Sequence, residues 1–387
     1  MSQNLRFPEF QGEWEKCKLS EICTFFSGGT PSSSNKDFYG GNIAFIRSGE
    51  LHADSTELFI TQAGFDSSSA KMVEIGDLLL AMYGATSGDI AASKIKGAIN
   101  QAILCIRTKQ NKKFIESVWN KHVSKNLRKY LQGGQGNLSA DIVKGISFFF
   151  PTLKEQEKIA NLVSLLDERI ATQNKIIDKL QTLIRGIMVE LQKQGLKNGT
   201  WKKFILADVL SERSELNINL HQVFSVSVSK GVVNQVEYLG RSFSAKDTSK
   251  YHVVHYGDIV YTKSPTGSFP YGIVKQSLNH DNVAVSPLYG VYKPKNFSTG
   301  MFLHQYFMSE VNTLNYLHPL IQKGAKNTIN ITNQRFLENR VAMPINTDTL
   351  LVISQLLRSL NYKIEYQQSL LLQYQKQKQY LLRQMFI

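Results

Sequence analysis

Two long stretches of the chain place apolar residues at spacings that alternate between four and three positions. In the first stretch only Gln173 is polar at these positions, and in the second the polar members are Gln367 and Lys378. This alternation is that of the a and d positions of a coiled coil, which form one apolar seam along a helix. The pattern predicts two long helices that pair with each other. The residues predicted to form the seam are Ile159, Val163, Leu166, Ile170, Gln173, Ile177, Leu180, Ile353, Leu357, Leu360, Ile364, Gln367, Leu371 and Tyr374.

The two glutamines occupy the same register near the middle of each seam. If the helices pack antiparallel about a pseudo-twofold axis, Gln173 and Gln367 meet at the centre, where a buried polar pair would fix the register. The alternative, that both face a gap or solvent, stays open. A helix of roughly 35 residues is about 50 Å long. Such a pair could hold two lobes apart by about one turn of B-DNA, roughly 34–36 Å.

The remainder of the chain is an internal repeat, in the order lobe, helix, lobe, helix. Each lobe ends at a proline, Pro151 in the first and Pro344 in the second, and a long helical stretch follows it. The matching segments are Trp14–Ile22 with Trp201–Val209, Gly76–Leu79 with Gly257–Val260, and Asn137–Ser139 with Asn330–Thr332. These matches predict a first lobe at 1–152, a first helix at 153–194, a second lobe at 195–345 and a second helix at 346–387.

Each lobe has the sequence pattern of an α+β domain that mixes strands and helices. The glycines of the linker 193–199 are expected to end the first long helix. We expect strands at 42–47, 103–107, 252–255 and 288–292, and helices at 113–131 and 301–317.

The composition favours an acidic binding partner and a location in the cytoplasm. The 387 residues include 45 lysines and arginines against 31 acidic residues, a formal charge of +14, and nucleic acid is the commonest partner of such a chain. Three cysteines without a Cys-x-x-Cys pair predict reduced thiols rather than a disulfide framework. The chain shows neither the apolar core of a signal peptide nor a run of about 18 apolar residues, so we expect no membrane association.

The motifs of DNA-modifying enzymes are missing from the sequence. None of the nine prolines adjoins another, so the Asn/Asp-Pro-Pro-aromatic motif of adenine methyltransferases is absent. No acidic residue has a lysine two positions later, as common nuclease centres require, and no phosphate-binding Gly-x-x-x-x-Gly-Lys-Ser/Thr loop occurs. His252 and His255 are more often ordinary histidines than metal ligands. We therefore expect no catalytic centre, no metal and no cofactor.

Polar loop residues are the candidates for DNA contact. Arginine and lysine suit the acceptors of guanine, and asparagine and glutamine suit adenine. Most contacts in such interfaces go to phosphates, so the loops as a whole carry more weight than any single side chain. The candidates are Asn35, Lys36, Arg47, Tyr83, Asn100, Gln101, Gln135 and Asn137 in the first lobe, and Arg241, Lys263, Ser264, Thr266, Ser268, Lys326, Asn327 and Asn330 in the second.

Taken together, segments spread over the whole chain resemble the specificity subunits of type I restriction-modification systems. No single motif is decisive, but their order and duplication are specific. The second half departs more, because Pro344 is not followed by Glu-Gln and Ser286-Pro287 replaces Asn100-Gln101. The segments that carry the resemblance are Arg6–Trp14, Gly28–Pro31, Tyr39–Ile43, Gly76–Leu79, Asn100–Ala102, Pro151 with Glu155–Ala160, Leu166–Ile170 and Leu381–Phe386.

The resemblance implies two target-recognition domains, each reading one half of a bipartite, asymmetric site in double-stranded DNA. It implies that the helices set the spacer and dock two modification subunits, which bind S-adenosylmethionine and methylate adenine. Motor-nuclease subunits that use ATP would complete the complex. Two alternatives remain: a part of a combined restriction-methylation enzyme, which would methylate DNA unaided, and a coiled-coil scaffold without specific DNA binding.

Overall fold

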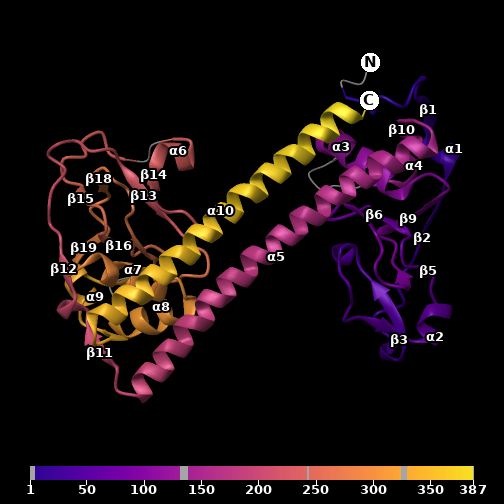
Figure 1. Ribbon diagram of the computed structural model, residues 1–387. Coiled ribbons are helices and arrows are strands. Elements are labelled where there is room, and N and C mark those ends of the chain that lie inside the picture. Colours follow the sequence, from indigo (N-terminus) through magenta and orange to yellow (C-terminus); the bar gives the residue numbers. More distant parts are fainter. Residues whose placement is uncertain (1–4, 131–137, 242–243, 324–328, 387) are drawn as a thin grey trace. The chain divides into compact units, whose positions relative to one another are not determined.

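The computed structural model of the protein describes residues 5–130, 138–241, 244–323 and 329–386. These form two compact units (Figure 1). Unit 1 comprises residues 1–174 and 370–387, and unit 2 comprises residues 175–369. Two long helices, α5 (Leu153–Lys197) and α10 (Thr347–Met385), are each divided between the two units, with one part of each helix in unit 1 and the other part in unit 2.

Unit 1 is built on two four-stranded sheets, of order β2-β9-β6-β7 and β4-β3-β8-β5, and the strand pair β1-β10. All neighbouring strands are antiparallel except β3 and β8, which are parallel. Its elements are β1 (Glu15–Lys18), α1 (Leu19–Ile22), β2 (Cys23–Ser27), η1 (Lys36–Phe38), β3 (Tyr39–Ile46), η2 (Ser48–Glu50), β4 (Phe59–Ile60), α2 (Gln62–Asp66), β5 (Lys71–Val73), β6 (Leu78–Ala81), β7 (Ile90–Ala92), β8 (Gly97–Ile99), β9 (Ile103–Thr108), α3 (Lys112–Tyr130), α4 (Ala140–Gly145) and β10 (Ser147–Phe150).

The end of α10 completes the main core of unit 1. Met385 and Phe386 are buried, and the Phe386 ring lies 5.2 Å from Phe114 and 6.5 Å from Trp14 between centroids. The Leu5 amide donates a hydrogen bond to the Gln384 carbonyl at 3.2 Å. Residues from both ends of the sequence therefore share one apolar core, which is stabilised by removing their rings from water.

Within unit 1, α5 and α10 pack antiparallel. Asp167 of α5 forms ion pairs with Lys378 of α10 and, at 2.9 Å, with Lys113 of α3. Two residues further along α5, Arg169 reaches Tyr374, four residues earlier in α10. Burial alone would raise the pKa of Asp167, but the two lysines outweigh it and lower that pKa. The polar seam position at Lys378 is thus matched by a carboxylate on the opposite helix.

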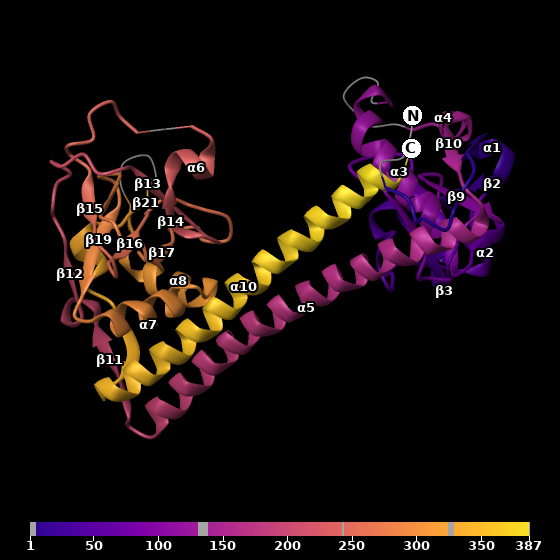
Figure 2. The same ribbon diagram turned by 45° about the horizontal axis from the view of Figure 1, so that its top comes forward.

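Unit 2 repeats part of this plan. The strand pair β11-β22 corresponds to β1-β10, and the four-stranded sheet β12-β19-β16-β17 corresponds to β2-β9-β6-β7. The α7 helix packs against β17 and β19 (Figure 2). The elements are β11 (Trp201–Ile205), η3 (Leu206–Asp208), β12 (Leu210–Glu212), β13 (Phe224–Ser227), β14 (Gly231–Asn234), α6 (Gln235–Leu239), β15 (His252–Val254), β16 (Ile259–Tyr261), β17 (Val274–Gln276), β18 (Val283–Val285), β19 (Gly290–Pro294), α7 (Phe297–Phe307), α8 (Glu310–Leu317), η4 (His318–Leu320), β20 (Gln322–Lys323), β21 (Ile329–Asn330), α9 (Asn333–Phe336) and β22 (Arg340–Pro344).

The repeated Gly-Asp pair has the same structural role in both units. Asp77 and Asp258 each accept a hydrogen bond from the backbone amide three residues earlier, at 3.0 and 2.8 Å. Each also accepts two hydrogen bonds from one arginine, Arg107 on β9 for Asp77 and Arg213, which follows β12, for Asp258. Because β12 corresponds to β2 and not to β9, the arginine comes from a different strand in each unit. Both units keep the ion pair, although the arginine comes from the adjacent strand β9 in unit 1 and from the end of β12, one strand further away, in unit 2.

Two expectations about helices were met only in part. The first long helix, α5, ends at Lys197 within the expected linker, and Gly199 follows with a φ of +68°, but Gly195 lies inside the helix. A Cβ at Gly195 would lie 2.0 Å from the Trp201 ring, so glycine permits this close packing. The helix expected at 301–317 is divided into α7 and α8. Ser309 begins α8 by accepting the Asn312 amide in a side-chain cap, which favours a new helix start over continuation.

Candidate nucleic-acid interface

In unit 1 the strand order brings two candidate residues to one sheet edge. The parallel strands β3 and β8 pair Ile46 with Ile99, so Arg47 and Asn100 leave the sheet side by side. Arg47 is exposed and pairs with Glu50 at 2.6 Å; its hydrogen bonds are the main reason that the pKa of Glu50 is lowered. The Asn100 side chain accepts the Ala102 amide at 3.0 Å, which fixes the following turn.

Two further loops of unit 1 meet at this edge. Gln101 accepts a hydrogen bond from the Thr30 hydroxyl at 2.7 Å, and the Gly28 amide donates to the Asn100 carbonyl at 3.2 Å. The Met82 amide donates to the Ala102 carbonyl and the Met82 carbonyl accepts from the Leu138 amide, both at 2.8 Å, which holds the exposed Tyr83 beside the same turn. The loops after β2, β3, β6 and β8 thus form one polar surface.

Not all candidates of the first lobe join this surface. Asn35 uses its side chain to cap η1, accepting the Asp37 amide at 3.1 Å, and Lys36 is exposed in that turn. Gln135 and Asn137 lie outside the described residues. Thr30, which ties two of the loops together, was missed by the sequence analysis because nothing in its local pattern distinguishes it from other loop threonines.

In unit 2 four of the candidates lie in a single loop, which connects β16 to β17. Its ends are joined by three hydrogen bonds. The Thr262 amide donates to the Ile273 carbonyl and the Ile273 amide donates to the Thr262 hydroxyl oxygen, both at 3.1 Å, and the Tyr261 hydroxyl donates to the Tyr271 carbonyl at 2.8 Å. Its tip is closed by two backbone hydrogen bonds of 3.0 Å between Thr266 and Phe269. The candidates of this loop are Lys263, Ser264, Thr266 and Ser268.

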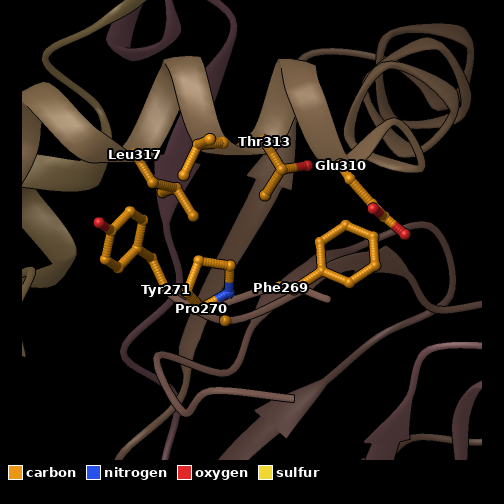
Figure 3. Close-up of a pocket in the computed structure, with 8 residues that line it drawn as sticks. Phe269, Pro270, Tyr271, Glu310, Thr313 and Leu317 are labelled. Carbon is orange, nitrogen blue, oxygen red and sulfur yellow. The ribbon is translucent and has the colours of Figure 1, made fainter. Parts of the chain in front are cut away.

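The far side of this loop packs on α8 (Figure 3). Phe269 and Tyr271 face Thr313 and Leu317, and the Ser268 hydroxyl donates to Glu310. The space between loop and helix is filled by side chains, so it is a packed contact rather than a ligand cavity. The loop is therefore a braced element with its tip exposed.

The other candidates of the second lobe lie outside this loop in the sequence. Arg241 is exposed beyond α6. Lys326 and Asn327 lie outside the described residues, and Asn330 ends the short strand β21.

The predicted seam residues of α5 and α10 are all sheltered from solvent. The buried ones are Ile159, Val163, Leu166, Gln173, Ile177, Ile353, Leu357 and Ile364, and the half-buried ones are Ile170, Leu180, Leu360, Gln367, Leu371 and Tyr374. This burial agrees with a packed helix face, while the direct pairing of Gln173 with Gln367 stays a prediction.

The described residues contain no cluster of three or more His, Cys, Asp or Glu side chains that could hold a metal ion. Burial raises the pKa of all three thiols, that of Cys105 to about 12, which opposes their ionisation to nucleophilic thiolates. In the part of the chain that is described, no helix has both the length and the apolar character needed to cross a bilayer.

The fold is thus a tandem duplication of one sheet-and-strand-pair design on two long helices. Residues 11–182 match the model of the type I restriction modification DNA specificity domain. Among solved structures, the chain resembles the crystal structure of a type I restriction-modification system S subunit from M. genitalium, with a TM-score of 0.66 and 12% identity over 100% of this chain and 99% of that one. The chain is thus similar to type I restriction-modification specificity subunits, in sequence over part of its length and in fold over all of it.

Two curated relatives show how similar the sequence of this chain is to those of known specificity subunits. The MjaIX specificity subunit of Methanocaldococcus jannaschii is 26% identical over 43% of this chain and 42% of its own length. The EcoR124I/EcoR124II specificity subunit of Escherichia coli is 28% identical over 46% of each chain. The chain therefore spans less than half of the length of these two relatives.

Proposed function

We propose that the protein is the DNA-recognition subunit of a type I restriction-modification complex and has no catalytic centre of its own. The observation that carries this proposal is the duplication: the specificity domain matched in residues 11–182 has a structural counterpart in unit 2, built on the equivalent sheet. In this proposal each of the two repeated lobes reads one half of a bipartite DNA site. The net charge of +14 supports duplex DNA as the partner.

The two polar loop surfaces are the proposed reading elements. In unit 1 the surface carries Arg47, Tyr83 and Gln101, and in unit 2 the loop between β16 and β17 carries Lys263 and Thr266. Amines, guanidiniums and amides are the groups that read base edges in the major groove. We propose that α5 and α10 set the spacer between the half-sites and dock two modification subunits, that motor-nuclease subunits join them, and that the complex acts in the cytoplasm.

The test of DNA recognition is a salt-dependent binding series with the full chain and its modification subunits. Binding to a cognate duplex is expected to weaken steeply with rising salt, because each phosphate contact releases a condensed counterion. A coiled-coil scaffold would show flat or absent binding under the same conditions. Methylation of DNA by this chain without any partner would instead indicate an enzyme.

The test of the one-lobe-per-half-site arrangement is an exchange of residues 1–150. Methylated adenines are mapped across the host genome with the native chain, without it, and with the first lobe replaced by that of another family member. Only one half of the methylated motif is expected to change. A simultaneous change of both halves would contradict independent reading by the two lobes.

A further inference from the structure

Lys263 opens the loop between β16 and β17 in a backbone conformation that lysine rarely adopts. Its φ is +60°, in the left-handed region. The Ser264 amide donates to the Thr262 carbonyl at 2.8 Å, which closes a three-residue γ-turn with Lys263 at its centre. With positive φ at its central residue, this turn is rare and strained. The loop holds the strained turn in place, because Gly272 packs against it so closely that a Cβ on Gly272 would lie 2.8 Å from the backbone nitrogen of Lys263.

The Lys263 side chain is also in an unfavourable environment. It is half-buried, and that burial lowers the pKa of its amine, although the charge of Glu212 opposes the shift. Within the described residues the amine forms no hydrogen bond and no ion pair. The residue thus adds backbone strain and a partly desolvated charge to the fold, and among the described residues only the charge of Glu212 offsets part of this cost.

The repeat shows that the scaffold does not require this arrangement. Counting from the matched Gly-Asp pairs, the position of Lys263 corresponds to Met82 in unit 1. Met82 is buried, and its φ is not positive. The same strand therefore continues into its loop in unit 1 with neither strain nor charge. Strain that the scaffold does not need is typical of functional positions.

We infer that Lys263 is a specificity-determining residue, whose amine donates hydrogen bonds to the acceptor edge of a base, guanine O6 and N7 above all, in the half-site read by unit 2. The inference rests on the proposed function. A phosphate contact needs only an exposed, flexible lysine, whereas a base edge must be met at a fixed position. The braced turn supplies that position, and partial burial of the amine has already removed part of its hydration before DNA arrives.

The experiment compares three variants of the full chain, assayed with the modification subunits of the same host. Lys263→Met removes the amine but retains the stem and the strained backbone. Lys263→Gly removes both the amine and the strain. Leu220→Gly is the matched control, because Leu220 also has a positive φ, +53°, and its side chain is 67% exposed. The probes are a duplex with the methylated motif of the host and duplexes altered at one half-site position each.

Both Lys263 variants are expected to lose discrimination at one base position of one half-site by about 5- to 150-fold. Lys263→Gly and Leu220→Gly are expected to raise the midpoint of thermal unfolding, because glycine relieves the backbone strain. Lys263→Met removes only the partly desolvated charge and is expected to raise the midpoint less than Lys263→Gly does. Leu220→Gly is expected to retain full discrimination.

Two results would overturn the inference while leaving the proposed function intact. One is unchanged discrimination in Lys263→Met. The other is equal weakening on every duplex together with a salt slope reduced by about one, which would assign the amine to a phosphate. If the native complex itself selected no sequence, the proposed function would fail with it.

Discussion

Lys275 has a buried amine with no acidic partner in the part of the chain that is described, and its replacement by methionine is expected to stabilise unit 2. The residue lies on β17 and is 3% exposed. Its Nζ lies 2.5 Å from Met308 Sδ, and no ion pair with a carboxylate is formed by this amine among the described residues. A thioether is a weak acceptor and does not replace the hydration of an ammonium group. Burial accordingly lowers the pKa of Lys275 to about 8.

The size of the effect follows from this shift. The unfolded chain releases the proton near its ordinary pKa of 10.5, so the difference from about 8 is about 2.5 pH units. At 1.36 kcal/mol per unit, burying the charge costs the folded state about 3 kcal/mol at pH 7. Between pH 8 and 10.5 the unfolded state binds the proton and the folded state does not. The free energy of unfolding of unit 2 therefore rises with pH across this window and is lowest below pH 8.

Lys275→Met removes the charge and retains the unbranched stem. We expect a free energy of unfolding about 3 kcal/mol higher at pH 7 and no rise from this residue between pH 8 and 10.5. Urea denaturation of the full chain, combined with hydrogen exchange of the amides of β16 and β17, measures both quantities for unit 2. Lys293→Met is the matched control, because Lys293 is exposed on β19 of the same sheet. An unchanged stability and pH slope in Lys275→Met would refute the reasoning.

Three further changes test the scaffold, and a fourth tests the proposed spacer. Asp258→Asn is expected to lower the free energy of unfolding by about 3–5 kcal/mol in urea, because a part-buried arginine loses its carboxylate; an unchanged midpoint would contradict this. Phe386→Ala is expected to lower the free energy of unfolding of unit 1 by about 3–5 kcal/mol, measured by hydrogen exchange of the amides in the sheets of unit 1. Exchange rates equal to those of the native chain would contradict this expectation. Replacing Gln173 and Gln367 together by leucine is expected to alter helix pairing in crosslinking, and unchanged geometry would exclude their contact. Inserting four residues within 170–184 is expected to lengthen the spacer of the methylated motif by about 6 Å, roughly two base pairs, whereas altered bases at unchanged spacing would reject the spacer function.

The sequence predicted those features that depend on local periodicity. The spacing of apolar residues, which alternates between four and three positions from Ile159 onward, predicted two long helices because it marks a single apolar helix face. It could not show that Met385 and Phe386, at the end of the second helical stretch, enter the core of unit 1. That contact joins residues about 270 to 370 positions apart in the chain, and no local pattern encodes it. Lys275 gave no signal either, since a lysine in a short strand is ordinarily exposed.

The candidate site was predictable as a set of loops and not as a set of contacts. Asn35 and Asn100 have the right chemistry for reading adenine, yet both use their side chains to cap the backbone of their own turns. Arg47 and the Asn100-Gln101 turn lie at one sheet edge only because β3 and β8 are parallel and in register. Sheet register is a non-local property, so residue type alone could not rank these candidates.

The duplication itself provides a way to separate scaffold from recognition. A feature that both units keep, such as the aspartate bound by an arginine, is needed by the sheet, and the change of strand that supplies Arg107 or Arg213 shows that position matters less than charge. A feature present in one unit alone is free of that requirement. The buried Met82 and Lys263 occupy corresponding positions, and only Lys263 combines a strained backbone with a partly desolvated charge. If the two lobes read different half-sites, their selectivity is expected to reside at such unequal positions.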